Sequence, residues 1–245
     1  VGYSNGALMA INHALQCDDF VDMPCPDGLV LMSPAIAITP VAAVANWHIA
    51  VSWMPYFEKF NWTAILPEVD PSKFTSFPMR AAWEIYQIAR NTHAQLEIPA
   101  EVAKLPPILT FQSLVDNTVT ASAITTNLYS RLPSNGSELL VYDINRNSTL
   151  LSLMKNPPLS PMGFFESAAP LNFGVTILTN RDVNSVEIDS LRLDAGKTEW
   201  TTNTTILAWP SGIYSLSHIA IPFAANDEVY GDGSTQNVKD SRIVF

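Results

Sequence analysis

The first residues of the chain spell a pattern that fixes a sharp turn between a strand and a helix. Residues 2–6 read Gly2-Tyr3-Ser4-Asn5-Gly6, which has the form G-x-S-x-G. In this pattern a serine sits on a strained strand-to-helix turn, and a side chain at either outer glycine is expected to clash with the neighbouring strand or helix. The amphipathic run 7–15 follows at once and predicts the helix that such a turn requires.

Strand-like and helix-like stretches alternate along the rest of the chain. Short apolar runs predict strands over 28–34, 107–112, 137–144, 174–179, 186–193 and 204–209. Helical periodicity predicts helices over 79–97 and 119–132. This alternation predicts the α/β class, with a mostly parallel sheet, a helical cap insertion and extra strands near the C-terminus. The alternating apolar and acidic residues of 186–193 predict a half-exposed edge strand.

The chain divides into three predicted parts. Residues 1–34 form the turn, helix and strand of the core, and residues 101–245 form its C-terminal half. Residues 35–100 depart from the strand–helix rhythm and are rich in aromatic side chains and prolines, which predicts a cap over the strand ends. The alternative for most of these aromatic residues is that they only fill a core.

A serine hydroxyl is a weak nucleophile at neutral pH and needs a base within hydrogen-bond reach, which is usually a histidine. The chain has four histidines. His13 lies about 13 Å along the helix from Ser4, at 1.5 Å per residue, and His48 and His93 fall in the predicted cap. His218 follows the last predicted strand and is therefore the candidate base, against the alternative of an ordinary surface or hydrogen-bonded histidine.

The base needs a carboxylate to orient it, and this carboxylate should follow a strand. Asp116 stands in a loop between the strand 107–112 and the helix 119–132, and its alternative role is a helix N-cap. Asp143 is the second candidate, because it also stands at a strand end. The order Ser4, Asp116, His218 is the chain order of nucleophile, acid and base in one group of hydrolases.

With these residues the chain resembles the α/β-hydrolase superfamily, and within it bacterial serine hydrolases of the lysophospholipase and monoacylglycerol-lipase type. The matching tracts are 2–6, 29–35, 111–119 and 217–220. The resemblance implies hydrolysis of a carboxylic ester through an acyl-enzyme, with Ser4 as nucleophile, His218 as base and Asp116 as its orienting acid. It also implies that the backbone N–H of Asn5 helps bind the oxyanion, and that the reaction uses no metal or organic cofactor.

Some features depart from the family pattern. Ser113 and Ser217 stand where glycine is usual, and the stretch between the strand 137–144 and His218 is long. The glycine–serine turn lies near the middle of an α/β-hydrolase domain, whereas here it begins at residue 2, after Val1. The resemblance therefore leads us to expect the C-terminal part of a longer protein, lacking the second oxyanion donor and showing little or no esterase activity in isolation.

The cap is expected to supply the substrate pocket. The candidate lining residues are Trp47, Trp53, Phe57 and Trp62. An apolar pocket above the nucleophile buries acyl chains, so a small-molecule ester with a medium acyl chain is the expected substrate. The alternatives are thioester, amide or lactone hydrolysis by the same triad, a non-catalytic hydrolase-like binding protein, and an unrelated α/β protein.

Composition limits the classes of partner that the chain is expected to bind. The net charge of −10 and the absence of a basic stripe argue against nucleic acid. No apolar run in the sequence reaches the roughly 20 residues of a membrane helix. Cys17 and Cys25 are close enough in sequence to bridge, but unpaired thiols are the favoured prediction, and no nearby histidine completes a zinc site. The sequence leaves the compartment and the oligomeric state open.

Overall fold

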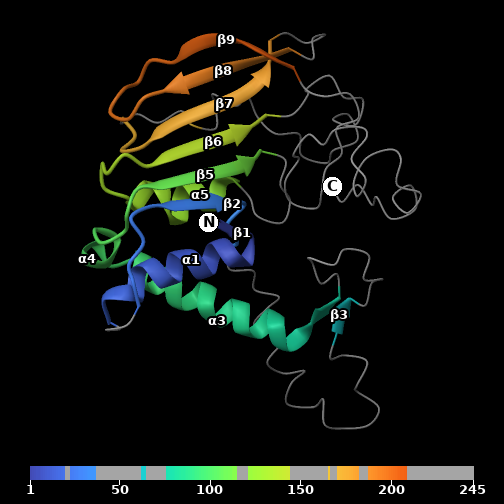
Figure 1. The fold of residues 1–245 in the computed structure, drawn as a ribbon, viewed down its shortest axis with the longest axis vertical. Helices are drawn as coiled ribbons and strands as arrows, with labels where there is room; N and C mark the ends of the chain where they lie inside the picture. Colours follow the sequence, from blue (N-terminus) through green and yellow to red (C-terminus); the bar gives the residue numbers. More distant parts are fainter. Residues whose placement is uncertain are drawn as a thin grey trace.

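A computed structural model describes residues 1–19, 23–36, 62–64, 76–114, 121–143, 165, 170–181 and 187–208. Within these residues a seven-stranded sheet dominates the fold (Figure 1). Its strands are β1 (Gly2–Tyr3), β2 (Leu29–Met32), β5 (Ile108–Ser113), β6 (Glu138–Tyr142), β7 (Gly174–Asn180), β8 (Glu187–Leu193) and β9 (Thr201–Ala208). The predicted α/β class is thus confirmed, and each predicted strand is present within a few residues of its expected bounds.

The strands follow the order β1-β2-β5-β6-β7-β8-β9 across the sheet. The first five run parallel to one another, whereas β8 is antiparallel to both β7 and β9. The carboxyl ends of β1, β2, β5, β6, β7 and β9 therefore meet at one edge of the sheet. We call this the carboxyl edge. A separate antiparallel pair is formed by β3 (Trp62–Ala64) and β4 (Phe77–Pro78).

Helices connect the strands. They are α1 (Asn5–Gln16), α3 (Met79–Leu96), α4 (Pro99–Val102) and α5 (Ala121–Asn127), with short 3-10 turns η1 (Cys17–Asp19) and η3 (Tyr129–Arg131). Helix α1 packs against β1, β2 and α3, and Asn12 of α1 donates a hydrogen bond of 3.2 Å to Thr92 of α3. The predicted helix 119–132 is divided into α5 and η3, which places the Tyr129 side chain in the core.

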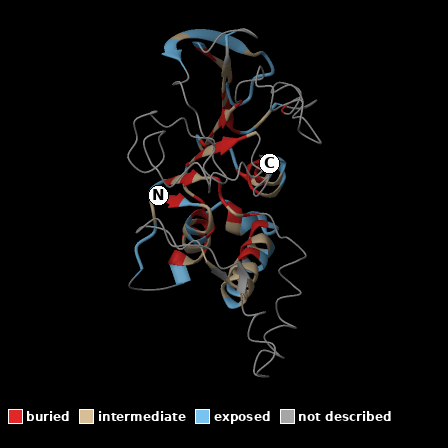
Figure 2. Cartoon of the chain, turned by 90° about the vertical axis from the view of Figure 1, so that its right-hand side faces the viewer, coloured by how far each residue is buried: buried red, intermediate tan, exposed pale blue. Residues whose placement is uncertain are grey.

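The core lies between the sheet and these helices (Figure 2). The buried strand residues Leu31, Val141 and Val175 are fully enclosed, as their apolar runs predict. Tyr129 is also fully enclosed, and its hydroxyl donates a hydrogen bond of 2.6 Å to the Glu138 carbonyl. Burial raises the pKa of Tyr129 well above its ordinary value, so the hydroxyl keeps its proton and its role as a donor.

One expectation about the sheet is wrong. Strand β8 is not an edge strand, because β9 pairs with it on its outer side and is itself almost entirely exposed (Figure 2). The acidic residue of β8 that was expected to face water, Asp189, has only 8% of its surface exposed. An ion pair with Arg181, at 3.0 Å, accounts for this burial.

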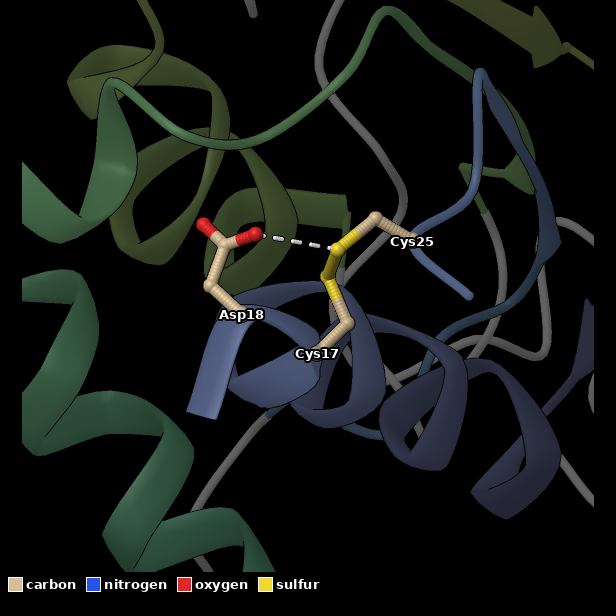
Figure 3. Close-up of side chains that lie close together, drawn as sticks. All are labelled: Cys17, Asp18 and Cys25. Atoms are coloured by element: carbon tan, nitrogen blue, oxygen red, sulfur yellow. Dashed lines mark hydrogen bonds between the residues drawn. A yellow bond between two sulfur atoms is a disulfide. The ribbon is translucent and has the colours of Figure 1, made fainter. Parts of the chain in front are cut away.

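The expectation of unpaired thiols is also wrong, because Cys17 and Cys25 form a disulfide with their Cα atoms 5.2 Å apart (Figure 3). The bond joins the end of α1 to the segment that leads into β2. An Asp18 carboxylate oxygen lies 3.2 Å from the Cys25 sulfur. A disulfide sulfur carries no hydrogen to donate, so this is a contact rather than a donated hydrogen bond.

Cys17, Asp18 and Cys25 bring their sulfur and carboxylate oxygen atoms within 4.8 Å of one another. Thiolates rather than disulfide sulfurs bind metals, so the oxidised pair does not supply a metal site. None of the helices in the described part of the chain is both long and apolar enough to cross a bilayer.

Candidate functional site

The turn from β1 to α1 holds Ser4 in a strained conformation at the carboxyl edge. Its backbone angles are φ 51° and ψ −115°, a region that a residue with a side chain rarely occupies. The surrounding backbone fixes these angles: the Ser4 N–H donates to the Met32 carbonyl at 2.8 Å, and the Ser4 carbonyl accepts from Ala7, Leu8 and Ala35 at 3.1–3.2 Å. Such a conformation costs about 1–3 kcal/mol and persists where the structure over-determines it.

The two glycines of the motif differ in what surrounds them. A Cβ atom on Gly2 would lie 2.5 Å from Ala7 Cα and 2.6 Å from the Gly6 carbonyl oxygen, so only glycine fits there. A Cβ on Gly6 would meet no described atom within 4 Å. The expected clash is therefore confirmed for Gly2 and is not found for Gly6, because the Gly6 position is the one that faces outward from the turn.

Asn5 is the first residue of α1 and directly follows the serine. The first four N–H groups of an α-helix have no acceptor inside the helix, and they carry its positive partial charge. Here the N–H groups of Ala7 and Leu8 are used by the Ser4 carbonyl. The N–H groups of Asn5 and Gly6 are the remaining two, and this position suits an oxygen that develops negative charge.

Sequence reasoning missed a second serine at this edge. Ser33 follows β2 next to Ser4, has a φ of 42°, and is fully buried. Its N–H donates to the Phe111 carbonyl at 3.0 Å, but its hydroxyl oxygen has no hydrogen-bond partner among the described residues. The signal for it was the Ser33-Pro34 pair at the end of a buried strand, which the sequence analysis used only to end that strand.

Asp143 stands at the same edge, at the end of β6, and is almost wholly buried. Its carboxylate accepts a hydrogen bond of 3.0 Å from the Thr179 hydroxyl, and its N–H donates to the Leu178 carbonyl at 2.9 Å. Three strand steps separate β6 from β1. Asp116, the first candidate acid, lies outside the described residues, so the choice of acid stays a prediction.

The described histidines contact other groups. His13 Nε2 lies 3.1 Å from the Pro24 carbonyl oxygen near the far end of α1, which agrees with its exclusion as the base. His93 Nδ1 lies 3.5 Å from a Glu97 carboxylate oxygen near the end of α3. His48 and His218 lie outside the described residues, so the assignment of His218 as the base stays a prediction.

The predicted pocket is largely outside the described part of the chain. This holds for Trp47, Trp53 and Phe57, while the backbone of Trp62 belongs to β3. The predicted boundaries 1–34, 35–100 and 101–245 stay predictions. Helix α3, which belongs to the predicted cap segment, packs along α1.

Comparison with known proteins gives a partial structural likeness. No family model matches the chain, and no curated protein matches it. Among solved structures, the chain is similar to a Paleococcus ferrophilus monoacylglycerol lipase, with 17% identity and a TM-score of 0.39 over 57% of this chain and 56% of the lipase. It is also similar to a soluble variant of Saccharomyces cerevisiae monoglyceride lipase in complex with a substrate analog, with 19% identity and a TM-score of 0.38 over 58% and 51% of the two chains. The chain spans about half the length of these two solved lipases. Its fold class is defined by its own seven-stranded sheet.

Proposed function

We propose that this chain carries the nucleophile of a serine hydrolase that cleaves carboxylic esters. The observation that carries the proposal is the conformation of Ser4, with φ 51° at the junction of a strand and a helix. A strained serine at such a junction projects its hydroxyl from the sheet toward a substrate. Backbone atoms packed around Gly2 leave no room for a side chain, so the close packing of this turn requires a glycine at that position.

The proposed reaction begins with attack of Ser4 Oγ on the ester carbonyl carbon. His218 takes the hydroxyl proton and returns it to the leaving alcohol, so that an acyl-enzyme forms and water then hydrolyses it. The Asn5 N–H donates to the carbonyl oxygen as its negative charge develops. This donor is fixed at the start of α1 before substrate arrives, which is the arrangement that makes such donors effective.

The proposal requires His218 to reach Ser4. Strand β9 ends at the carboxyl edge, six strand spacings from β1, which is about 29 Å at 4.8 Å per spacing. His218 comes ten residues after Ala208. Ten extended residues span at most about 33–36 Å, which exceeds this distance.

Two carboxylates are candidates to orient the imidazole. Asp116 follows β5, two strand steps from β1, and Asp143 ends β6, three steps away. We propose Asp116, because Asp143 already accepts a hydrogen bond from Thr179. In this proposal Asp116→Asn lowers kcat by about 10⁴-fold, as loss of the correct imidazole tautomer does elsewhere, whereas Asp143→Asn changes kcat much less.

The proposal is tested by covalent labelling of the protein with a fluorophosphonate. We expect one labelled peptide, carrying the adduct on Ser4, and complete loss of labelling and ester turnover in Ser4→Ala. Ser33→Ala is the matched control, since Ser33 also has a positive φ and lies beside Ser4 but is fully buried. A folded protein that is not labelled at Ser4 would contradict the proposal and favour the non-catalytic binding protein.

The substrate class is the finer part of the proposal. If the aromatic residues of 35–100 form an acyl pocket, each added CH₂ contributes up to about 0.8 kcal/mol of binding in the transition state. We therefore expect kcat/KM for p-nitrophenyl esters to rise about three- to fourfold per methylene from acetate until the pocket is full. A flat or falling profile would leave the hydrolase proposal in place and remove the acyl pocket.

A further inference from the structure

Three side chains with metal-binding atoms meet where α1 ends. Cys17 and Asp18 lie in η1, directly after α1, and Cys25 comes from the segment that leads into β2 (Figure 3). The two sulfurs and an Asp18 carboxylate oxygen lie within 4.8 Å of one another. Zn²⁺ binds both thiolate sulfur and carboxylate oxygen. The sulfurs become available only after the disulfide is reduced, because the thiolate is the form that binds a metal.

The separations between these atoms suit ligands of one zinc ion. With bonds of about 2.3 Å to sulfur and about 2.0 Å to oxygen at tetrahedral angles, a sulfur and an oxygen ligand stand about 3.5 Å apart, and two sulfur ligands about 3.8 Å. The Asp18 oxygen and the Cys25 sulfur are already 3.2 Å apart. The Cα atoms of the two cysteines are 5.2 Å apart, so rotation about their Cα–Cβ bonds can bring the reduced sulfurs to the zinc-bound separation.

The three side chains differ in their access to water. Cys17 is only 4% exposed, whereas Asp18 and Cys25 are exposed. An ion bound among them would have a buried sulfur on one side and solvent on the other. Three protein ligands leave a fourth tetrahedral position, which water fills in open zinc sites. The exposed side also gives the reductant and the metal ion a path to the sulfurs.

Negative charge around η1 favours a cation there. The Lys104 ammonium group donates to Glu101 at 2.8 Å, and this hydrogen bond is the largest cause of its raised pKa. The charges of Asp19 and Asp18 also raise the pKa of Lys104. Both carboxylates therefore contribute to the negative potential at this end of α1, but only Asp18 belongs to the group of potential ligands.

A hydrogen bond joins the same two segments as the disulfide does. His13 Nε2 lies 3.1 Å from the Pro24 carbonyl oxygen. A carbonyl oxygen only accepts, so Nε2 is the donor. His13 stands one helical turn before Cys17 on α1, and Pro24 directly precedes Cys25. This bond does not depend on the disulfide, so it favours the same arrangement of the two cysteines after reduction.

We propose that reduction of the Cys17–Cys25 disulfide creates a Zn²⁺ site made of Cys17, Asp18 and Cys25. A dithiol reductant transfers two electrons and two protons to the sulfurs, which become two thiols, while the dithiol closes to its own cyclic disulfide. Zn²⁺ then displaces the two thiol protons to solvent, forms two Zn–S bonds and takes an Asp18 oxygen as its third protein ligand. The sequence analysis excluded a zinc site for want of a nearby histidine, whereas here a carboxylate is the further ligand.

The zinc ion takes over the connection that the disulfide makes. It links the end of α1 to the segment before β2, so these segments are joined in the oxidised state by the disulfide and in the reduced state by the metal. The site lies about 20 Å along α1 from Ser4, at 1.5 Å per residue. The proposal goes beyond the proposed function and does not depend on it.

The test titrates Zn²⁺ into the protein after reduction by a dithiol, which is removed under an inert atmosphere before the titration. Calorimetry in buffers of different ionisation enthalpy gives the number of ions bound and protons released. We expect the reduced protein to bind one Zn²⁺ more than the double variant Cys17→Ala/Cys25→Ala, with release of about two protons. The oxidised protein should bind no more than the double variant. Zn²⁺ should raise the midpoint of thermal unfolding of the reduced protein only.

Two neighbouring carboxylates provide a matched pair of variants. In the reduced protein Asp18→Asn should weaken Zn²⁺ binding at least about 10-fold, because loss of a ligand costs no less than loss of a group that orients one. Asp19→Asn removes the same charge from the same turn and should change the affinity by less than about threefold.

Three outcomes overturn the inference. Hydrogen exchange of the strands β2, β5 and β6 shows whether the reduced protein stays folded, and loss of their protection on reduction would exclude a site built on this fold. A folded reduced protein that binds no more Zn²⁺ than the double variant contradicts the proposal directly. Equal weakening by Asp18→Asn and Asp19→Asn would show that Asp18 acts only through its charge and is not a ligand.

Discussion

The first strands of the sheet and its last strands are packed in different ways, and one closely surrounded glycine in each region shows the difference. In the nucleophile region (β1, α1 and β2), a Cβ on Gly2 would lie 2.5 Å from Ala7 Cα. In the hairpin region (β7, β8 and β9), a Cβ on Gly174 would lie 2.5 Å from a Glu138 carboxylate oxygen and 2.7 Å from Arg192 Nη2. Backbone encloses the first glycine, and the ends of charged side chains enclose the second.

The difference follows from what each region has to hold in place. The nucleophile region fixes a strained serine, and backbone hydrogen bonds with buried apolar contacts do this with little freedom to adjust. In the hairpin region β9 is almost entirely exposed, so little apolar burial is available to hold it. Ion pairs between Arg181, Arg192 and their carboxylates join these strands instead, and flexible side chains allow them to adjust.

The largest expected effect is a loss of stability in the nucleophile region, and its absence would contradict the comparison of the two regions. Gly2→Ala should destabilise the protein by about 3 kcal/mol or more, because backbone atoms of α1 must move to admit the methyl group. Gly6→Ala should change the free energy of unfolding by less than about 1 kcal/mol, since nothing described lies within 4 Å of its Cβ. Urea unfolding of the two variants measures both free energies of unfolding. Equal losses would show that the backbone around Gly2 can move to admit a methyl group.

The disulfide gives an intermediate effect within the nucleophile region. Cys17 and Cys25 close a short loop, and the chain-entropy estimate for it is about 2.5 kcal/mol. Selective reduction, or the double variant Cys17→Ala/Cys25→Ala, should lower stability by about this amount. Hydrogen exchange should show the loosening at the end of α1 and the segment before β2. An effect that spreads equally to β7–β9 would mean that the two regions are coupled more tightly than their contacts indicate.

The smallest expected effect sharpens the comparison on the hairpin side. Gly174→Ala should cost only about 1 kcal/mol, because the Glu138 and Arg192 side chains can swing away and lose a partly exposed ion pair. The same substitution in the variant Arg192→Ala should cost even less, as one of the two crowding groups is then gone. Thermal unfolding of the single and double variants gives the interaction energy between residue 174 and Arg192. A loss of stability in Gly174→Ala as large as that in Gly2→Ala would show that flexible side chains do not surround Gly174.

Much of the fold follows from local patterns in the sequence. Apolar runs and helical spacing predicted the strands of the large sheet after β1 and the helices α1 and α3 to within a few residues, because most of these elements bury one face of their own side chains. The short pair β3 and β4 was not predicted. The position of β8 was not predictable in this way. Its alternating pattern is typical of an edge, and its burial depends on Arg181 and on pairing with β9, which are contacts with other segments.

The candidate site shows the same difference between features that depend on local sequence and features that depend on contacts between distant segments. The motif at residues 2–6 predicted the strained turn, since Gly2 and the start of α1, which shape it, are adjacent to Ser4 in the sequence. Hydrogen bonds with Met32 and Ala35 also hold the turn, and these the motif does not show. The disulfide and the buried Ser33 were missed because sequence spacing does not show whether two sulfurs meet or whether a hydroxyl finds a partner. Asp116 and His218 stay predictions, as their relation to Ser4 depends on segments outside the described residues.

Residues 205–207 of β9 stand opposite a single residue of β8, and this β-bulge has a consequence for how molecules of this protein meet one another. In the described sheet β9 is the outermost strand, and Ile206 and Leu207 expose 103% and 55% of their surface there. A flat outer strand with exposed apolar residues offers its backbone to the strand of a second molecule and favours aggregation. The extra residues at 205–207 interrupt the regular spacing of donors and acceptors that such pairing needs. The irregularity therefore shortens the stretch of β9 to which a second copy can add.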